Sequence, residues 1–181
     1  MRSELDANVV ATAVKAALSG QKPTITDEQA KAVMEPFMAK MQAKEKAAIA
    51  QEAAKNKTEG AEFLAKNKTK PGVKTTASGL EYQVITPGTG ARPGPTDTVE
   101  INYTGSFING EVFDASAKHG PKPAEIPLAN VIPGFREGLQ LMQVGGHYKL
   151  FIPSSLGYGS EANAHMPPNA TLIFDVTLVK T

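Results

Sequence analysis

The chain has 181 residues, of which 41% are hydrophobic and 20% charged, and its formal net charge is +1. This is the composition of a folded protein of one or two domains, not of a disordered chain. The nearly balanced charge argues against nucleic acid as a partner. Cysteine is absent and the three histidines lack metal-binding spacing, so we expect no disulfide, no metal and no cofactor.

Membrane and export signals are also missing from the sequence. No run of about 18 apolar residues is present, so no transmembrane helix is predicted. The first six residues lack the apolar segment of a signal peptide, so an exported protein would be represented here by its mature or trimmed form.

The first 70 residues are helical in character and hold only 2 of the 16 glycines and 2 of the 13 prolines. Apolar residues at helical spacing predict a first helix over residues 5–18, ended by Gly20. A second helix is predicted to begin at Thr24 or at Thr26, where a capping box lies, and Pro36 should kink it. If it runs from about residue 27 to about residue 67, this helix spans roughly 60 Å at 1.5 Å per residue.

The apolar stripe of this second helix thins after Met41. Residues 44–57 are mostly Ala, Lys, Glu and Gln, which predicts a helix surrounded by solvent that bridges two domains, weakened locally by Gly60. We therefore predict a helical dimerisation region (1–41), a long connecting helix with linker (42–70) and a second domain (71–181).

The first 41 residues have too little apolar surface to enclose a core by themselves. A second copy of the chain could supply the missing surface through an adaptable, methionine-containing interface. The alternative is a helical hairpin packed on the second domain of the same chain. We favour the homodimer.

Residues 71–181 hold the other 14 glycines and 11 prolines and read as strands and turns. Strands are predicted over 80–85, 98–106, 147–153 and 171–180, and one short helix over 133–142. An antiparallel sheet with a short helix packed on it belongs to the α+β class.

One stretch of this region suggests a binding site. Tyr103, Phe113 and Asp114 lie on two neighbouring segments joined by an Asn109-Gly110 turn, where both positions tolerate positive φ. Together they would form an aromatic pocket with one carboxylate at its rim. Since no nucleophile or metal accompanies them, the pocket would act by binding and shaping its substrate.

Five ordered motifs resemble the FKBP family of peptidyl-prolyl cis/trans isomerases. They are Val99-x-Ile101-x-Tyr103-Thr104-Gly105, Asn109-Gly110-x-x-Phe113-Asp114-x-Ser116, Val131-Ile132-Pro133-Gly134-Phe135-x-Glu137-Gly138-Leu139, Leu156-Gly157-Tyr158-Gly159 and Pro167-Pro168-Asn169-Ala170-Thr171-Leu172-Ile173-Phe174-Asp175-Val176. The long solvated helix is similar to that of the macrophage infectivity potentiator (Mip) subgroup, which consists of bacterial V-shaped homodimers.

The resemblance implies a five- or six-stranded antiparallel half-barrel wrapped over a short helix, with a proline pocket between them. It implies catalytic roles for Asp114, Ile132 and Tyr158. The substrate-binding residues that it implies are Tyr103, Phe113, Val131, Phe135 and Phe174. Phe135 stands where the family usually has tryptophan.

Each of these residues also has a structural alternative. Phe174 could simply be core, Asp114 could cap backbone N–H groups in a loop, and Tyr158 could anchor its loop. The order of the motifs favours the pocket.

The resemblance implies an isomerase of X-Pro bonds in folding proteins, with chaperone activity. The implied partners are proline-containing peptides, unfolded protein clients and macrolide inhibitors of the FK506 or rapamycin type. The alternative is a non-catalytic chaperone or adhesion module that uses the dimer cleft. The subgroup implies a periplasmic or outer-membrane location, with the cytoplasm as the alternative.

Overall fold

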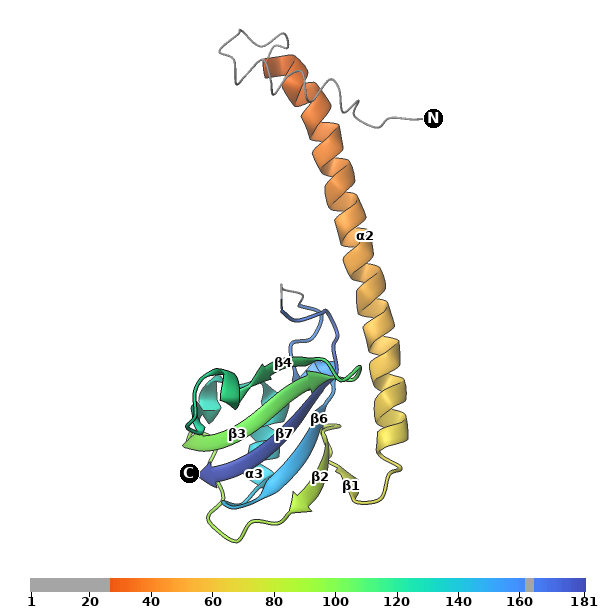
Figure 1. Ribbon diagram of the computed structural model, residues 1–181. Helices are drawn as coiled ribbons and strands as arrows, with labels where there is room; N and C mark the ends of the chain where they lie inside the picture. Colours follow the sequence, from red (N-terminus) through yellow and green to blue (C-terminus); the bar gives the residue numbers. More distant parts are fainter. Residues whose placement is uncertain (1–26, 162–164) are drawn as a thin grey trace. The chain divides into compact units, whose positions relative to one another are not determined.

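The computed structural model describes residues 27–161 and 165–181, with side chains from residue 31 onward except that of residue 33 (Figure 1). The helix predicted over residues 5–18 and the capping box at Thr26 lie outside the described residues. The chain divides into two compact units, with the boundary between residues 47 and 48. In the part of the chain that is described, no helix is both long and apolar enough to cross a bilayer.

Helix α2 (Asp27–Asn67) contains 41 residues and confirms the predicted second helix. Pro36 lies inside the helix without ending it. Helix α2 crosses the boundary between the two units, so its last 20 residues belong to the second unit.

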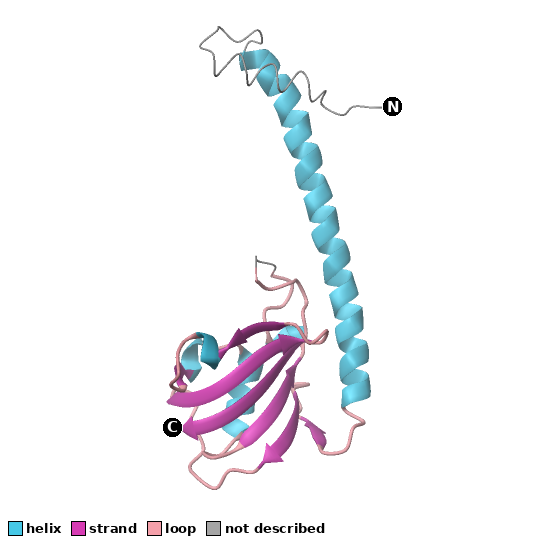
Figure 2. Cartoon of the chain, viewed as in Figure 1, coloured by secondary structure: helices cyan, strands magenta, loops and turns pink. Residues whose placement is uncertain are grey.

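The second unit is built around a seven-stranded antiparallel sheet in the order β1-β2-β6-β7-β3-β4, with β5 paired to β3 (Figure 2). The strands are β1 (Val73–Thr75), β2 (Glu81–Thr86), β3 (Thr98–Phe107), β4 (Val112–Ala115), β5 (Ala124–Pro127), β6 (His147–Ile152) and β7 (Leu172–Lys180). Three short 3-10 helices, η1 (Ser116–Lys118), η2 (Leu128–Asn130) and η3 (Ser154–Leu156), lie in the connections.

The four predicted strands correspond to β2, β3, β6 and β7 with ends within one residue, and the α+β class is confirmed. The expectation of five or six strands is wrong. Strands β1, β4 and β5 contain only three or four residues each, which is too few for a recognisable alternation of polar and apolar residues.

Helix α3 (Pro133–Leu141) packs on one face of the sheet, behind the strands in Figure 1. Two glycines allow this close approach. A Cβ atom at Gly134 would lie 2.5 Å from Cγ2 of Ile152, and one at Gly138 would lie 2.4 Å from Cδ1 of Leu150. The fully buried core between helix and sheet consists mainly of aliphatic side chains: Leu80, Val99, Ile101, Leu128, Leu139, Met142, Leu150, Ile152, Leu172, Val176 and Leu178.

The last turns of α2 pack on the sheet of the second unit. The expectation of a helix surrounded by solvent is therefore wrong for this part of α2. The contact residues recur at steps of three and four, and therefore lie on one face of the helix. These residues are Ala53, Asn56, Gly60, Phe63 and Asn67, and all of them are buried or half-buried.

Their contacts lie on the opposite face of the sheet from α3 and at the start of β7. The ring centroids of Phe63 and Phe151 are 6.0 Å apart, and the buried Asn67 amide donates a 2.9 Å hydrogen bond to Glu81. The helix is continuous through Gly60, the residue expected to weaken it locally. A Cβ at Gly60 would lie 2.3 Å from Oγ1 of Thr171, so glycine is what allows this contact.

We predict that Gly60→Ala destabilises the protein, although alanine is the better helix former. The overpacking typically costs about 1–3 kcal/mol, whereas the helix propensity gains at most about 1 kcal/mol. Urea unfolding followed by near-ultraviolet circular dichroism of the tyrosines would measure the change. Thr171→Ala removes Oγ1 and leaves Cβ at 3.3 Å as the nearest atom, so it should relieve part of the cost. Strictly additive effects of the two substitutions would contradict this interpretation.

Candidate functional site

Four aromatic side chains meet between α3 and the sheet. The Phe174 ring on β7 contacts the other three, with centroid distances of 4.6 Å to Phe135, 5.6 Å to Phe113 and 6.2 Å to Tyr103. Tyr103 also lies edge-on to Phe135 at 6.3 Å. The structure therefore brings together the four aromatic residues that the sequence predicts for the pocket.

Gly105 makes room for this cluster. It pairs with Asp114 across β3 and β4 and with Phe174 across β3 and β7. A Cβ at Gly105 would lie within 3 Å of the rings of both Phe113 and Phe174. The glycine of the Tyr103-Thr104-Gly105 motif thus lets two aromatic rings pack against the surface of β3.

The four rings differ in burial. Phe135 and Phe174 are 4% and 7% exposed, while Tyr103 and Phe113 are half-buried. Phe174 is thus part of the core, as its structural alternative predicts, and at the same time contacts all three other rings. Phe135 and Phe174 form the base of the cluster, and Tyr103 and Phe113 form its more open side.

Asp114 lies beside the cluster with both carboxylate oxygens engaged. The Tyr103 hydroxyl donates a 2.6 Å hydrogen bond to Oδ2, and the Ala115 N–H donates a 2.8 Å bond to Oδ1. Nε2 of His119 lies 2.9 Å from the same Oδ1. The backbone bond from Ala115 agrees with the capping alternative, but the bond from Tyr103 connects the carboxylate directly to the aromatic cluster.

These contacts determine the charge of both groups. Burial raises the pKa of Asp114, but the hydrogen bonds from Tyr103, His119 and the Ala115 N–H outweigh it, so the net pKa is below its usual value. Burial, followed by the hydrogen bond to Asp114, raises the pKa of the Tyr103 phenol. At neutral pH Asp114 is therefore a fixed anion and Tyr103 a neutral hydrogen-bond donor.

Val131 and Ile132 lie between η2 and α3 and pack against the core as partly buried side chains. Arg136 fixes this segment, because its guanidinium donates hydrogen bonds to the carbonyls of Leu128, Ala129 and Val131 at 2.8, 3.0 and 3.4 Å. The Ile132 carbonyl accepts bonds from the first turn of α3. The Ile132 N–H makes no hydrogen bond to another described residue, so it can serve a ligand.

Tyr158 follows η3 in the connection between β6 and β7 and is 44% exposed. It lies close enough to Tyr103 to contribute to the raised pKa of that phenol. The backbone holds the loop, since the Gly159 N–H donates to Ser154 and the Asn169 N–H donates to Gly159. The Tyr158 hydroxyl makes no hydrogen bond to another described residue, which argues against the loop-anchor alternative.

Sequence reasoning missed two neighbours of the site. The Phe107 ring lies 4.9 Å from Phe113, and the only signal for it was its position on the same face of β3 as Tyr103. His119 follows Asp114 by five residues, a spacing that places two residues together in neither a strand nor a helix. The 3-10 helix η1 returns the chain and brings the imidazole to the carboxylate.

The hairpin turn predicted at Asn109-Gly110 is present between β3 and β4. Gly110 has a φ of 87°, but Asn109 is not in the left-handed region. The Phe107 N–H donates to the Glu111 carbonyl and the Gly110 N–H to the Phe107 carbonyl. The loop therefore has three residues and ends in a left-handed glycine, which is a common hairpin connection.

Comparison with known proteins identifies the family. Residues 90–179 match the family model of the FKBP-type peptidyl-prolyl cis-trans isomerase, and residues 1–84 match that of the domain amino terminal to it. The chain is 41% identical over 97% of its length to the outer membrane protein MIP of Legionella longbeachae, and covers 76% of that protein. This chain belongs to the FKBP-type peptidyl-prolyl cis-trans isomerase family.

Other relatives agree with this assignment. The isomerase FkpA of Aeromonas hydrophila is 44% identical over 97% of this chain, which spans 65% of the length of that relative. The crystal structure of FkpA from Escherichia coli superposes with a TM-score of 0.82 and 36% identity, covering 98% of this chain and 82% of that one. A crystal structure of a peptidyl-prolyl cis-trans isomerase from Pseudomonas syringae superposes with a TM-score of 0.65 and is 34% identical in sequence. The match covers 70% of this chain and 93% of that one. The FKBP-like fold is thereby confirmed.

We predict that Tyr103→Phe raises the pKa of Asp114, because it removes the hydrogen bond to Oδ2. Titration of the Asp114 carboxyl carbon by ¹³C NMR would measure the shift. In the wild type the lowered pKa stabilises the fold above the unfolded pKa of about 3.9, and this stability is lost as the pH falls through the lower folded pKa. The variant should have less of this stability to lose.

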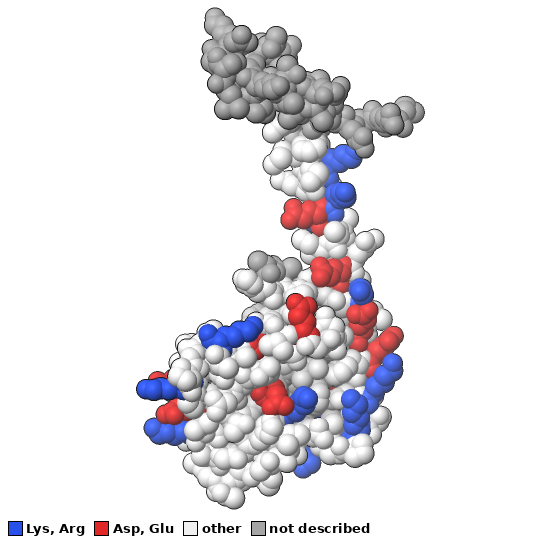
Figure 3. All heavy atoms as spheres, in the orientation of Figure 1, with Lys and Arg blue, Asp and Glu red and all other residues white. Residues whose placement is uncertain are grey.

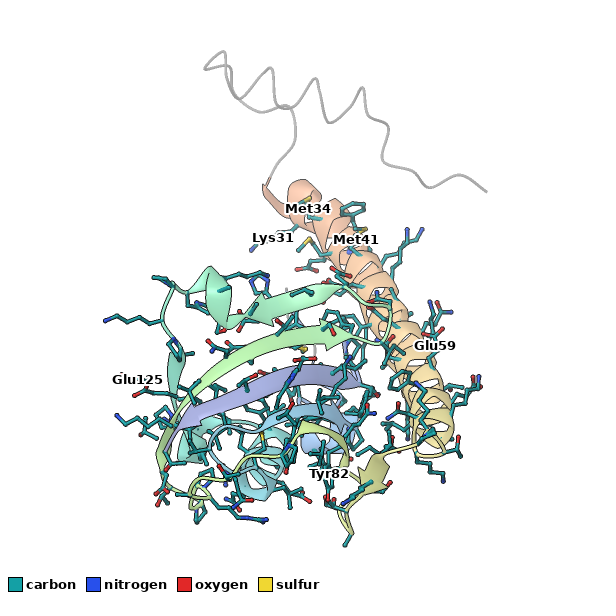
Figure 4. All side chains as sticks on the ribbon, turned by 60° about the horizontal axis from the view of Figure 1, so that its bottom comes forward. Lys31, Met34, Met41, Glu59, Tyr82 and Glu125 are labelled. Atoms are coloured by element: carbon teal, nitrogen blue, oxygen red, sulfur yellow. The ribbon has the colours of Figure 1, made fainter. Side chains whose placement is uncertain are left out.

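The matched control for this titration is Tyr82→Phe. Tyr82, labelled in Figure 4, lies on β2, and its ring stacks on that of Tyr148, which is not one of the four clustered rings. This variant should leave the Asp114 titration unchanged. An Asp114 pKa that is the same in all three proteins would show that the Tyr103 hydroxyl does not stabilise the carboxylate.

Proposed function

We propose that the chain catalyses cis/trans isomerisation of X-Pro bonds in peptides and in unfolded protein clients. The observation that carries this proposal is the aromatic cluster with a hydrogen-bonded carboxylate beside it, at the positions of the FKBP motifs. We assign this activity to residues 71–181 and regard residues 42–70 as a connecting segment.

The reaction needs no covalent step. Rotation about the X-Pro bond has a barrier of about 18–20 kcal/mol, because the planar amide is conjugated. The planar amide is the more polar form and is best solvated by water, whereas the twisted amide has lost conjugation and is less polar. A dry aromatic surface therefore raises the free energy of the planar form relative to the twisted form. The rings of Tyr103, Phe113, Phe135 and Phe174 would supply that surface to the proline ring.

Polar groups at the site would hold the flanking chain while the amide turns. The Ile132 N–H and the Tyr158 hydroxyl are both free of other described partners and would donate to substrate carbonyls, which is a positioning effect. The Asp114 carboxylate would act by its charge and by orienting Tyr103. Because its pKa is lowered and both its oxygens accept hydrogen bonds, it is poorly suited to act as a base.

The base of the pocket differs from the FKBP family pattern, because phenylalanine stands at position 135 in place of the usual tryptophan. Phe135 keeps an apolar surface, but it is smaller than tryptophan and lacks the indole N–H. Val131 and Ile132 would complete the wall. Macrolide inhibitors of the FK506 or rapamycin type would occupy the same pocket as the proline ring.

We expect Asp114→Leu to lower kcat/KM for short X-Pro peptides about tenfold or more, since hydrogen bonds to charged groups contribute about 1.5–3 kcal/mol. Tyr158→Phe removes a neutral hydrogen bond and should cost about two- to tenfold. NMR exchange or protease-coupled assays would measure both rates. Asp175→Asn is a suitable control, because Asp175 contacts His147 on the opposite face of β7 from Phe174. A folded wild-type protein with no catalysis above background would refute the proposal.

We further propose that the N-terminal part of α2 binds a second copy of the chain. Four large apolar side chains are exposed there at helical spacing: Met34 at 53%, Phe37 at 41%, Met38 at 50% and Met41 at 50%. Residues at steps of three and four form one stripe, and Figure 4 labels Met34 and Met41 on this helix. An intramolecular hairpin would cover the same stripe with residues 5–18.

The exposed stripe also favours a second function, a chaperone or adhesion module that holds clients between two copies. The face of the molecule seen in Figure 3 carries acidic and basic side chains intermixed, with broad uncharged areas between them. Such a surface lacks the single-sign charge that binding of a highly charged polymer would need.

The double substitution Met34→Glu/Met38→Glu should convert a dimer into a monomer, because it places two charges in the apolar interface. Sedimentation equilibrium would report the mass. We expect peptide isomerisation to be retained and suppression of aggregation, measured by light scattering, to be lost. Ala39→Glu/Ala43→Glu adds the same charges on the opposite face of the helix. This control should change neither the mass nor the suppression of aggregation. A wild-type monomer would exclude the homodimer and leave the hairpin.

We propose a location in the cell envelope, either in the periplasm or at the outer membrane. The Mip-like organisation supports it, and the Legionella longbeachae relative is named an outer membrane protein.

A further inference from the structure

Helix α2 holds the connection between β6 and β7 by two reciprocal hydrogen bonds. The Asn56 side-chain amide donates to the Pro168 carbonyl at 2.9 Å. In the other direction, the Asn169 side-chain amide donates to the Ala53 carbonyl at 3.2 Å. Both bonds are partly buried, and they join segments more than 100 residues apart in the sequence. We refer to Asn56 and Asn169 as the asparagine clamp.

The clamp is connected directly to the segment that carries Tyr158. The Asn169 N–H donates a 2.7 Å hydrogen bond to the carbonyl of Gly159, the residue that follows Tyr158. Gly159 in turn donates to the Ser154 carbonyl at 2.9 Å. Three consecutive hydrogen bonds thus lead from α2 to the two ends of the turn that presents the Tyr158 side chain.

The backbone at Asn169 is held in an uncommon conformation. With a φ of 54°, it is the one non-glycine residue in the left-handed region among those described. Asparagine tolerates this region better than most residues, but it is still a minority conformation. Here it allows one residue to donate its N–H to Gly159 and its side chain to Ala53. The two hydrogen bonds between helix and loop therefore hold Asn169 in a backbone conformation that it would adopt less often by itself.

Rigidity on the helix side comes from the next turns of α2. Asn56 shares its face with Gly60 and Phe63, which contact Thr171 and Phe151 respectively. Since these residues pack on the sheet, the helix presents Asn56 at a fixed position relative to β7. The position of the loop is thereby fixed relative to β7, the strand that carries Phe174.

We propose that Asn56 is a positioning residue of the isomerase site, which acts by holding the loop that carries Tyr158 where its hydroxyl can meet the substrate. This inference rests on the proposed isomerase function. It assigns a role in substrate binding to a residue of α2, outside residues 90–179 that match the isomerase family model. Helix α2 would then position a substrate-binding loop as well as connect the two parts of the chain.

The experiment uses the full chain and the variant Asn56→Leu, which keeps the size of the side chain but removes its donor. We expect KM for X-Pro peptides to rise about two- to tenfold, the effect of one lost hydrogen bond, with kcat nearly unchanged. Thr58→Ala is the matched control, because the Thr58 hydroxyl donates to the Ala54 carbonyl within the helix. Asn56→Gln retains the amide and should restore part of the affinity.

A double-mutant cycle separates positioning from general destabilisation. If Asn56 acts through Tyr158, then Asn56→Leu should have little further effect on KM in a Tyr158→Phe background. Equal effects in both backgrounds, or an unchanged KM for Asn56→Leu, would overturn the proposal.

Amide hydrogen exchange at Asn169 gives a readout that does not depend on catalysis. Its N–H is bonded to Gly159, so loss of the clamp should make it exchange faster, while amides in β7 keep their protection. Unchanged exchange at Asn169 in Asn56→Leu would show that the clamp does not hold the loop. A wild-type protein without isomerase activity would instead refute the proposed function and the role in substrate binding with it, whatever the exchange result.

Discussion

The site depends on the packing of one ring, Phe174, against three others. This side chain projects from β7, the strand next to the middle of the sheet, and it touches rings from β3, β4 and α3. Because interiors are closely packed, the position of Phe174 fixes the spacing between helix and sheet at the site. Gly105 and Gly134 are small for the same reason, since a Cβ at either would collide with this packing or with the neighbouring strand.

A single carboxylate provides the local charge of this apolar surface. Asp114 is kept ionised by three donors, and one of them is the hydroxyl of a ring in the cluster. The Tyr103–Asp114 bond therefore couples the packing of the rings to the electrostatics of the site. A fixed anion beside an apolar surface suits a reaction in which the polarity of an amide changes while no proton moves.

Helix α2 plays different parts along its length. Near residues 34–41 it exposes an apolar stripe, whereas from Ala53 to Asn67 it packs on the unit that contains the sheet and reaches the Tyr158 loop. The same three-and-four spacing serves both segments, with large apolar side chains in the first and, in the second, small or amide side chains together with the aromatic ring of Phe63. Close approach in the second segment depends on Gly60, where any larger residue would separate helix and sheet.

The sequence by itself determined the elements whose patterns are long: the extent of α2, the four longer strands, helix α3 and the order of the FKBP motifs. Periodicity over six or more residues, or identity at many ordered positions, is enough for such inferences. Only the tertiary structure decided the short strands, the contact of His119 with Asp114 and the docking of α2. The reason is that each of these depends on a partner distant in sequence. Gly60 and Asn56 show this most clearly. From the local sequence Gly60 is a weak point of the helix, and its role follows only from its contact with Thr171. Asn56 is locally a solvated polar residue, and its role follows only from its hydrogen bond to Pro168.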